Sequence, residues 1–545
     1  MRRLLPWILP VIILVVAVTA LSVVSAAFGD PDVHFIIGAL GSVQFVLNTN
    51  AAALTSAMAV LIALVLLTVQ LTAQRYSFSV LSIFVQDRVN SLLIGLFIIT
   101  IVFNLWLGLV LKENYIPAFA TMVAMGMMTL CFAMLPPYIL YLFDIIRPDS
   151  ILDHIQQQFL RAIAPARNGS TRRIEQQRAL ATRRISQMGD IARTAVNLSD
   201  GAVARHSVWT LYWSIARYLE EKERLPPGWF EVEEHHFRGR HELAVREIEA
   251  TMTWVEVRML DELREVFFAT LNKLHDVNNT VALVLRLLGE KAVERDDAGL
   301  SAAVAKFFNT FLRAAINQGD VRAGYHVLYQ YRLLADTAMD THPNLTLQIA
   351  HRLSYYGDAA AGGPLLWMSA AAAYDLRMLA EQAHARLSAP GRHGPDAGAA
   401  IVGAIVEDVI DTVRRGEAKR SPALPQLYKM VIALGAYFLH HDVPEQVRHL
   451  CAVLVSIPQD TLERLGAELA AVDDPAFWEL TDRVVNFDYV EYEVRTHIPE
   501  LLALVADAAD GGNETDGGAG RADGNDRGDG AGALVRPGAA APTSS

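Results

Sequence analysis

The sequence predicts an all-α protein in which four transmembrane helices precede a large cytoplasmic α-helical domain, built as a bundle or in a solenoid-like way. Four long stretches without Asp, Glu, Lys or Arg lie within the first 143 residues. The rest of the chain reads as amphipathic helices separated by Pro and Gly. Of the 545 residues, 19% are charged and 52% are hydrophobic, which excludes a disordered or fibrous protein.

The four apolar stretches are each long enough to cross a membrane, since a helix needs about 20 apolar residues to span about 30 Å of hydrocarbon. We therefore expect a transmembrane domain at residues 1–146, with spans at about 4–28, 51–74, 92–111 and 116–143. The first stretch has an alternative interpretation as a cleaved signal peptide, because Arg2 and Arg3 precede it and small residues end it. Its apolar run exceeds the usual length of a signal peptide, which favours a retained span.

The arginines and lysines next to the spans predict the orientation, because cytoplasmic loops carry the excess of positive charge. One side holds Arg2, Arg3, Arg75, Arg88, Arg147 and Arg161. The other side offers only Lys112, beside Glu113. Both termini are therefore expected in the cytoplasm. The external loop at residues 29–50 contains an apolar stretch at 35–47 that would lie along the outer interface or re-enter the membrane.

Beyond the spans, we expect about a dozen helices. Residues 147–298 combine a basic juxtamembrane segment with one long helix at about 244–277, where apolar residues recur at steps of three and four. This stripe would pack inside the chain or form an oligomeric coiled coil. Residues 299–510 read as short paired helices without a fixed repeat period. Residues 511–545 contain no Phe, Tyr, Trp, Ile or Met, so we predict a disordered tail.

Composition and motifs indicate no catalytic or cofactor site. The net charge of −12 argues against a nucleic-acid partner. The two cysteines, Cys131 and Cys451, allow at most one disulfide and are expected as buried thiols. The sequence lacks the GxxxxGK[ST], GxSxG and HExxH motifs, which favours a protein that is not an enzyme.

The densest group of possible metal ligands lies at residues 231–242 and is expected to be a solvated surface. It consists of Glu231, Glu233, Glu234, His235, His236, His241 and Glu242. Adjacent helical residues point about 100° apart, so His235 and His236 would rarely share one ion. A second spaced pair of ligands is also missing, and the same objection applies to His440 and His441. We therefore predict no metal site.

The candidate residues inside the membrane are neutral. Gln70 and Asn104 are polar, and the spans contain no ionisable group of the kind that ion-coupled transport requires. Asn104 is expected to hydrogen-bond across a helix interface or, alternatively, to line a pore. Pro136 and Pro137 remove two backbone donors and should bend the fourth span, as a fixed bend or as a gating hinge.

Nine arginines lie between residues 147 and 193, against four acidic residues. A basic segment just inside the bilayer is attracted to anionic lipid headgroups by about 1 kcal/mol per close charge. We predict headgroup contacts for Arg147, Arg161, Arg167, Arg172 and Arg173. In the alternative interpretation these arginines are only the orientation signal on an exposed helix face.

A distinctive pattern links the second and third spans. It runs Gln-Leu-Thr-Ala-Gln-Arg-Tyr-Ser over 70–77, and continues through Phe84, Asp87, Arg88 and Leu-Ile-Gly-Leu-Phe over 93–97. With this pattern, residues 50–145 resemble a bacterial family of predicted multispan membrane proteins of unknown function. Ser77 and Asp87 match that family, whereas Phe78 and Ser79 stand where Pro and Arg are usual. The resemblance implies a multispan bacterial inner-membrane protein and no reaction.

The same segment predicts an interfacial elbow. Ser77 can cap a short helix that turns Phe84 toward lipid. Asp87 and Arg88 would then lie at headgroup level, with Asp87 at the N-terminus of the third span. This elbow would fix the angle between two spans, and a sensing or gating role is the alternative.

Together these features predict a non-enzymatic, homo-oligomeric protein of the inner membrane. Its cytoplasmic helical body would bind a protein partner or serve as a regulatory platform. The alternative is an ion channel whose pore forms between subunits, suggested by the neutral polar residues and the proline pair of the spans.

Overall fold

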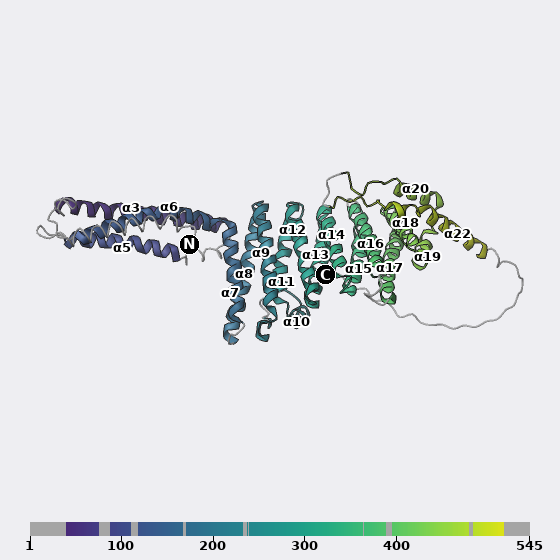
Figure 1. Cartoon of the computed structure of the whole chain (residues 1–545), viewed down its shortest axis with the longest axis horizontal. Helices are drawn as coiled ribbons and strands as arrows, with labels where there is room; N and C mark the ends of the chain where they lie inside the picture. The colour runs from purple at the N-terminus through teal and green to yellow at the C-terminus, as the bar shows by residue number, and fades with distance from the viewer. Residues whose placement is uncertain are drawn as a thin grey trace, which may run out of the picture. The chain divides into compact units, whose positions relative to one another are not determined.

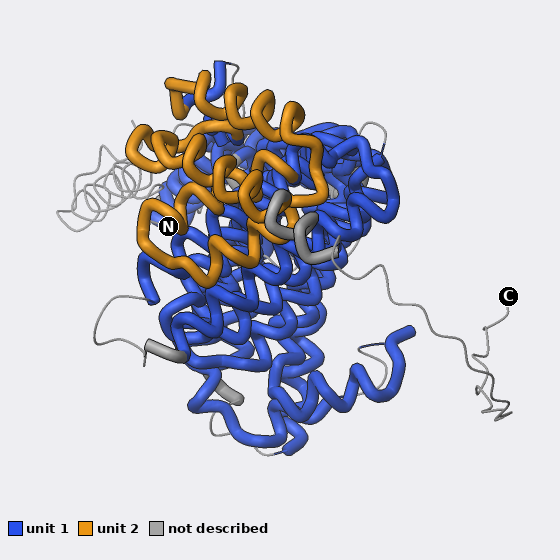
Figure 2. The backbone as a smooth tube through the Cα atoms, turned by 90° about the vertical axis from the view of Figure 1, so that its right-hand side faces the viewer, with its two compact units in different colours: residues 1–427, 476–487 blue, residues 428–475, 488–545 orange. Residues whose placement is uncertain are grey.

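The computed structural model describes residues 40–75, 88–110, 118–166, 171–232, 237, 239–362, 365–387, 395–478 and 483–516. Within these ranges every regular element is a helix and no strand occurs, so the predicted all-α class is confirmed (Figure 1). The chain divides into two compact units (Figure 2). Unit 1 comprises residues 1–427 and 476–487, and unit 2 comprises residues 428–475 and 488–545.

Three helices near the N-terminus are long and apolar enough to cross a membrane. They are α3 (Leu40–Arg75), α5 (Arg88–Val110) and α6 (Ala118–Ile146). Their candidate spans, Gly41–Gln70, Val89–Leu109 and Phe119–Phe143, correspond to the second, third and fourth predicted spans. The first predicted span, at 4–28, lies outside the described residues.

Helix α3 begins earlier than the sequence indicated, at Leu40 instead of near residue 51. Residues 40–50, which were expected in an external loop, are therefore helical and continuous with the span. The segment contains no proline and no charged residue that would end a helix. Val43 and Leu47 also pack in one cluster with Leu107 and Ala124, which keeps the added turns in contact with α5 and α6.

The three membrane helices pack against one another through two apolar clusters. One cluster is centred on Leu54, Leu61, Leu93, Phe97, Cys131, Tyr138 and Leu142. The other is the cluster around Leu47 and Leu107. Large side chains such as Trp106 and Leu109 stay exposed on the outside, as lipid-facing residues do.

The helical region of unit 1 is a series of helices packed in two rows. Each helix contacts the next one and a later one in its own row, which is the packing of an α-solenoid. One row contains α7 (Pro148–Ala166), α9 (Gly201–Lys222), α12 (His275–Glu294), α14 (Val321–Ala338) and α16 (Leu366–Leu387). The other contains α8 (Thr171–Asn197), α11 (Trp254–Thr270), α13 (Ala298–Gln318), α15 (Pro343–Ala359) and α17 (Pro395–Lys419).

The same tight turn joins successive helices at three places. In each, a residue in the left-handed region is followed by an aspartate that caps the next helix: Ser199-Asp200, Asp296-Asp297 and Gly319-Asp320. Each aspartate side chain accepts a hydrogen bond from a backbone N–H in the first turn of the new helix, and this satisfies one of its open donors. These short connections hold consecutive helices antiparallel.

The prediction of a single long helix at about 244–277 is wrong. The segment forms α10 (Glu242–Ala250), α11 and the start of α12. Met252 and Asn272 interrupt it with φ angles of 54° and 57°, in a region that an α-helix cannot continue through. Much of the apolar stripe is nevertheless buried, since Ile248, Val255 and Met259 lie in the core, whereas Met252 at the break is 48% exposed. Tight turns preserve a spacing of three and four, so periodicity alone did not reveal the breaks.

Unit 2 is a small helical unit. It contains most of α18 (Leu424–His440), together with α19 (Pro444–Leu454), α20 (Gln459–Ala470), α21 (Tyr492–Arg495) and α22 (Ile498–Asp516). Helix α22 packs on α19 and α20 and buries Leu501 and Val505. The predicted tail begins within α22, and its residues 517–545 lie outside the described part of the chain.

Candidate functional site

Asn104 lies in the interior of the three membrane helices, where its side chain is fully buried. Its Nδ2 donates to the Thr100 carbonyl at 2.8 Å, while its Oδ1 has no hydrogen-bond partner among the described residues. On α3, Asn50 is also buried, and its Nδ2 likewise has no partner in the described part of the chain. These two atoms are a complementary donor and acceptor.

The register of α3 and α5 places Asn50 and Asn104 at the same level. Leu47 shares one cluster with Leu107, and Leu61 shares the other with Leu93, so the two helices run antiparallel. Asn50 is three residues after Leu47, and Asn104 is three residues before Leu107. This placement is the one expected of a residue that packs between helices.

The other intramembrane candidates lie apart from Asn104. Gln70 is exposed at the end of its candidate span. Pro136 is exposed and Pro137 is buried, and α6 is one helix through both. Thr100, one turn from Asn104, contacts Cys131 at 3.4 Å, so the prolines lie further along α6.

The predicted elbow and headgroup contacts are only partly within the described residues. Ser77, Phe84, Asp87 and Arg167 lie outside them, and α5 begins at Arg88. Arg147 is exposed and lies 3.5 Å from Asp149. Exposed side chains are also found at Arg161, Arg172 and Arg173. Exposure is what a headgroup contact requires, and the contacts themselves stay a prediction.

Other arginines of the basic segment turn inward. Arg178 is buried, and its Nη1 donates to the carbonyls of Gly228 at 3.1 Å and Glu231 at 2.5 Å. Glu231 therefore belongs to a loop that Arg178 holds in place. His241 accepts a hydrogen bond from the N–H of Leu243 at the start of α10. Among the described residues, no group of three or more His, Cys, Asp and Glu side chains could hold a metal ion.

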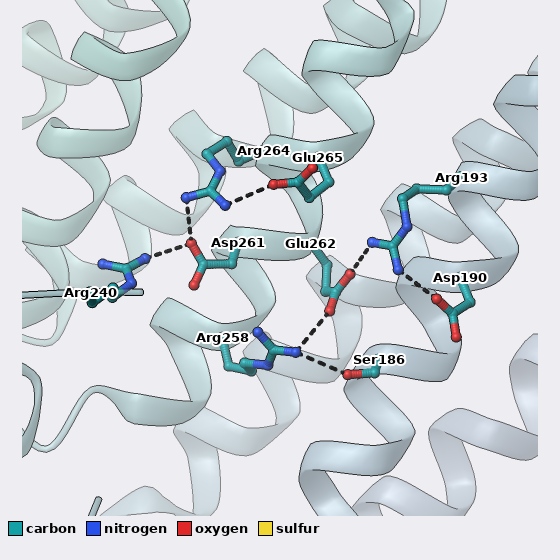
Figure 3. Close-up of polar contacts among 9 residues, drawn as sticks. All are labelled: Ser186, Asp190, Arg193, Arg240, Arg258, Asp261, Glu262, Arg264 and Glu265. Carbon is teal, nitrogen blue, oxygen red and sulfur yellow. Dashed lines mark hydrogen bonds and ion pairs between the residues drawn. The ribbon is translucent and has the colours of Figure 1, made fainter. Parts of the chain in front are cut away.

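Arg193 belongs to a polar network between α8 and α11 (Figure 3). Its Nη1 donates to Glu262 Oε2 and its Nη2 to Asp190 Oδ1, both at 2.5 Å. Arg258 approaches the other oxygen of Glu262 at 3.5 Å and donates to Ser186 at 3.2 Å. Glu262, only 4% exposed, is the buried centre of this network.

Burial and charge act in opposite directions on this pair. Burial raises the pKa of Glu262, and Arg193 offsets part of that increase. Burial would lower the pKa of Arg193, but Glu262 and Asp190 outweigh it and raise the pKa. The ion pair therefore opposes the protonation of Glu262 that burial favours. A Cβ at Gly189 would lie 2.0 Å from Glu262 Oε2, so only glycine lets α8 approach this closely.

Asp261, next to Glu262, points toward different partners (Figure 3). It accepts from Arg240 at 2.5 Å and lies 3.1 Å from Arg264. Both arginines line a pocket of about 310 Å³ between α10, α11 and α13, together with Lys306 and Glu247. Lys306 pairs with Glu247 at 2.6 Å, so each of the three cations of this pocket already has a carboxylate partner.

A second buried network joins residues 476–487 to α14 and α16 within unit 1. Arg483, almost fully buried, donates to Asp375 at 2.9 Å and to the Tyr325 carbonyl at 2.7 Å. Its guanidinium carbon lies 4.3 Å from the centroid of the Tyr325 ring, a cation–π contact. Arg332 pairs with Asp375 at 3.2 Å and with Asp336 at 2.6 Å. Burial raises the pKa of Asp336 to about 6, although Arg332 opposes this.

Neither network was predicted from the sequence. Arg193 and Glu262 are 69 residues apart, and Asp375 and Arg483 are 108 residues apart. One signal was present in α11, since Glu262 falls between Met259 and Val266 on the buried stripe. A carboxylate in an apolar stripe indicates a buried cation on a neighbouring helix.

The comparisons with known proteins concern the membrane helices. No curated protein and no solved structure matches the chain. Residues 5–200 match the model of a family described as "Predicted membrane protein (DUF2254)". This range includes α3, α5 and α6 and continues through α8, well beyond the residues that carried the resemblance. The predicted resemblance to a family of predicted membrane proteins of unknown function is therefore confirmed, and it extends over residues 5–200.

Proposed function

We propose that this chain is a non-enzymatic, homo-oligomeric protein of the bacterial inner membrane whose helical region binds a partner protein in the cytoplasm. The observation that carries the proposal is the serial two-row packing from α7 to α17. Helices stacked in this way form an extended surface, and proteins use such surfaces mainly for binding. The missing catalytic motifs support the same conclusion.

The orientation rests on the positive charges beside the spans. Four spans, including the one expected at 4–28, return both termini to the side that carries Arg75, Arg88 and Arg147. A reporter that is active only in the cytoplasm should therefore be active after Ser545. Activity of an exterior-only reporter at that position would contradict the proposed orientation.

An aromatic group on α9 with one exposed tryptophan is the part of the surface that best fits a partner. The ring centroids of Tyr212 and Trp213 are 4.9 Å apart, and those of Trp209 and Trp213 are 6.5 Å apart. Trp213 nevertheless remains 53% exposed. Tryptophan and tyrosine are enriched among the residues that dominate binding energy at protein interfaces.

Cross-linking in native membranes followed by mass spectrometry tests both parts of the proposal. We expect cross-links between copies of the chain and to a second protein. Trp213→Ala should abolish the second set, whereas Trp478→Ala, at another exposed tryptophan, should not. A chain that remains monomeric and captures no partner would contradict the proposal.

The alternative function is an ion channel with a pore between subunits, which the proline pair inside α6 favours. The burial of Asn104 within one chain instead supports a packing role for that residue. Planar-bilayer recording separates the two functions. A protein-dependent current that changes in Pro137→Ala or Asn104→Leu would favour the channel, and the platform predicts no current.

A further inference from the structure

A second pocket, of about 440 Å³, lies between α13, α14 and α15. Its polar lining consists of Lys306, Asn309, Tyr331, Gln348, His351 and Arg352. None of the described residues that line this pocket is acidic, although the whole chain carries a net charge of −12. The volume is within the range of small-molecule sites.

Arg352 distinguishes this pocket from the one between α10, α11 and α13. Its side chain is exposed on α15 and forms no salt bridge with any described residue. The other two basic side chains of the lining are paired, Lys306 with Glu247 at 2.6 Å and His351 with Asp408 at 3.0 Å. Positive charge is therefore left over on the α15 side of the pocket.

Neutral hydrogen-bonding groups form the buried side of the pocket. The Tyr331 ring is buried, and burial raises the pKa of its hydroxyl well above the ordinary value, so that the hydroxyl keeps its proton. Arg352 and Asn309 act in the opposite direction, which places both of them near this hydroxyl. Asn309 Oδ1 is buried without a hydrogen-bond partner in the described part of the chain.

We propose that this pocket binds the phosphate group of a small soluble molecule. Arg352 would supply the positive charge, and the Tyr331 hydroxyl would donate a hydrogen bond to a phosphate oxygen. A guanidinium matches the geometry of phosphate with two parallel N–H donors. Its interaction with phosphate is stronger when no carboxylate competes for the guanidinium. The pocket is larger than a lone phosphate needs, so the remainder of the molecule also fits. This site is independent of the oligomeric and partner-binding function proposed above.

Isothermal titration calorimetry of the full detergent-solubilised chain with inorganic pyrophosphate tests the proposal, with ionic strength held constant by sodium chloride. We expect the wild-type chain to bind, and Arg352→Gln to bind at least about tenfold more weakly, because one charge-assisted contact is lost. Arg352→Lys should lie between the two. The control is Arg217→Gln on α9, whose side chain is equally a surface arginine and pairs with Glu220. It should bind like the wild type.

Three results of this titration would overturn the proposal. They are no binding at millimolar pyrophosphate, unchanged binding in Arg352→Gln, and equal weakening in Arg352→Gln and Arg217→Gln, which would indicate unspecific attraction. Phosphatidylglycerol vesicles provide a further arm that separates a lipid headgroup from a soluble phosphate. Arg352-dependent binding to these vesicles without binding to pyrophosphate would assign the pocket to the membrane surface and overturn a soluble ligand.

Discussion

Replacement of Gly189 by alanine should destabilise the protein, although the same change usually stabilises a helix. In an exposed helix interior, alanine is about 1 kcal/mol more favourable than glycine. At this position the new Cβ would lie 2.0 Å from Oε2, 2.6 Å from Cδ and 2.9 Å from Cγ of Glu262. The Glu262 side chain must therefore leave its place between α8 and α11.

The cost follows from the contacts that Glu262 would lose. Removing one side of a buried ion pair costs about 3–5 kcal/mol, because a charge stays buried without its partner. Arg193 is one-third exposed, so the lower end of this range applies. After the gain in helix propensity, Gly189→Ala should lower the free energy of unfolding by about 2 kcal/mol.

The same substitution in the Glu262→Ala variant provides a matched test of the prediction. In Glu262→Ala the obstacle is gone, so adding Gly189→Ala to that variant should stabilise the chain by about 1 kcal/mol. Thermal unfolding of the detergent-solubilised chain should show melting temperatures that shift in opposite directions in the two backgrounds. Compared with its own parent, Gly189→Ala should raise hydrogen exchange in α8 and α11 in the wild-type chain and leave it unchanged in Glu262→Ala, where the contact is already lost. A shift of the same sign in both backgrounds would refute the reasoning.

Three further predictions concern the other buried polar groups. The pKa of Asp336 is raised to about 6 from 3.8, so the folded state holds the proton of this carboxyl more tightly than the unfolded state does. The free energy of unfolding should therefore fall by about 3 kcal/mol as pH rises from about 4 to about 6. Melting curves of Asp336→Asn should lack this part of the pH dependence. Arg483→Met should destabilise unit 1 by about 3 kcal/mol, because it leaves Asp375 buried with Arg332 as the remaining cation. Limited proteolysis should then cut residues 476–487 faster than in the wild type. An unchanged cleavage rate would contradict this prediction. Trp254→Phe should lower the free energy of unfolding by about 1–2 kcal/mol, because the Trp229 carbonyl loses its 2.8 Å hydrogen bond inside the core. A decrease below about 0.5 kcal/mol in thermal unfolding would show that the bond contributes little.

The membrane part was the most predictable from sequence, because hydrocarbon requires long apolar helices and leaves few alternatives. The starting point of α3 was not predicted, because apolar and neutral residues continue the pattern of a span without marking where it begins. Residues 40–50 carry no charge that marks the edge of a span, and their contact with Leu107 and Ala124 depends on helices far along the chain.

The helical region was predictable in class but not in arrangement. Its periodicity indicated buried faces correctly, as at Val255 and Met259. The turn at Met252 was hidden, because a methionine in the left-handed region carries none of the sequence signals of glycine or asparagine. The candidate site was harder still. The ion pair of Arg193 with Glu262 and the unpaired charge of Arg352 depend on which helix faces meet, and local sequence does not specify this.

The link from Arg483 to Asp375 has a consequence for synthesis on the ribosome. The arginine follows the aspartate by 108 residues. At about 5–20 residues per second, translation leaves Asp375 without this cation for about 5–20 seconds. During that interval Arg332, made earlier, is the one cation among the described residues that pairs with the carboxylate. The repeated helices must therefore assemble around an incompletely compensated charge, and the last contact closes only when the C-terminal part of the chain has emerged.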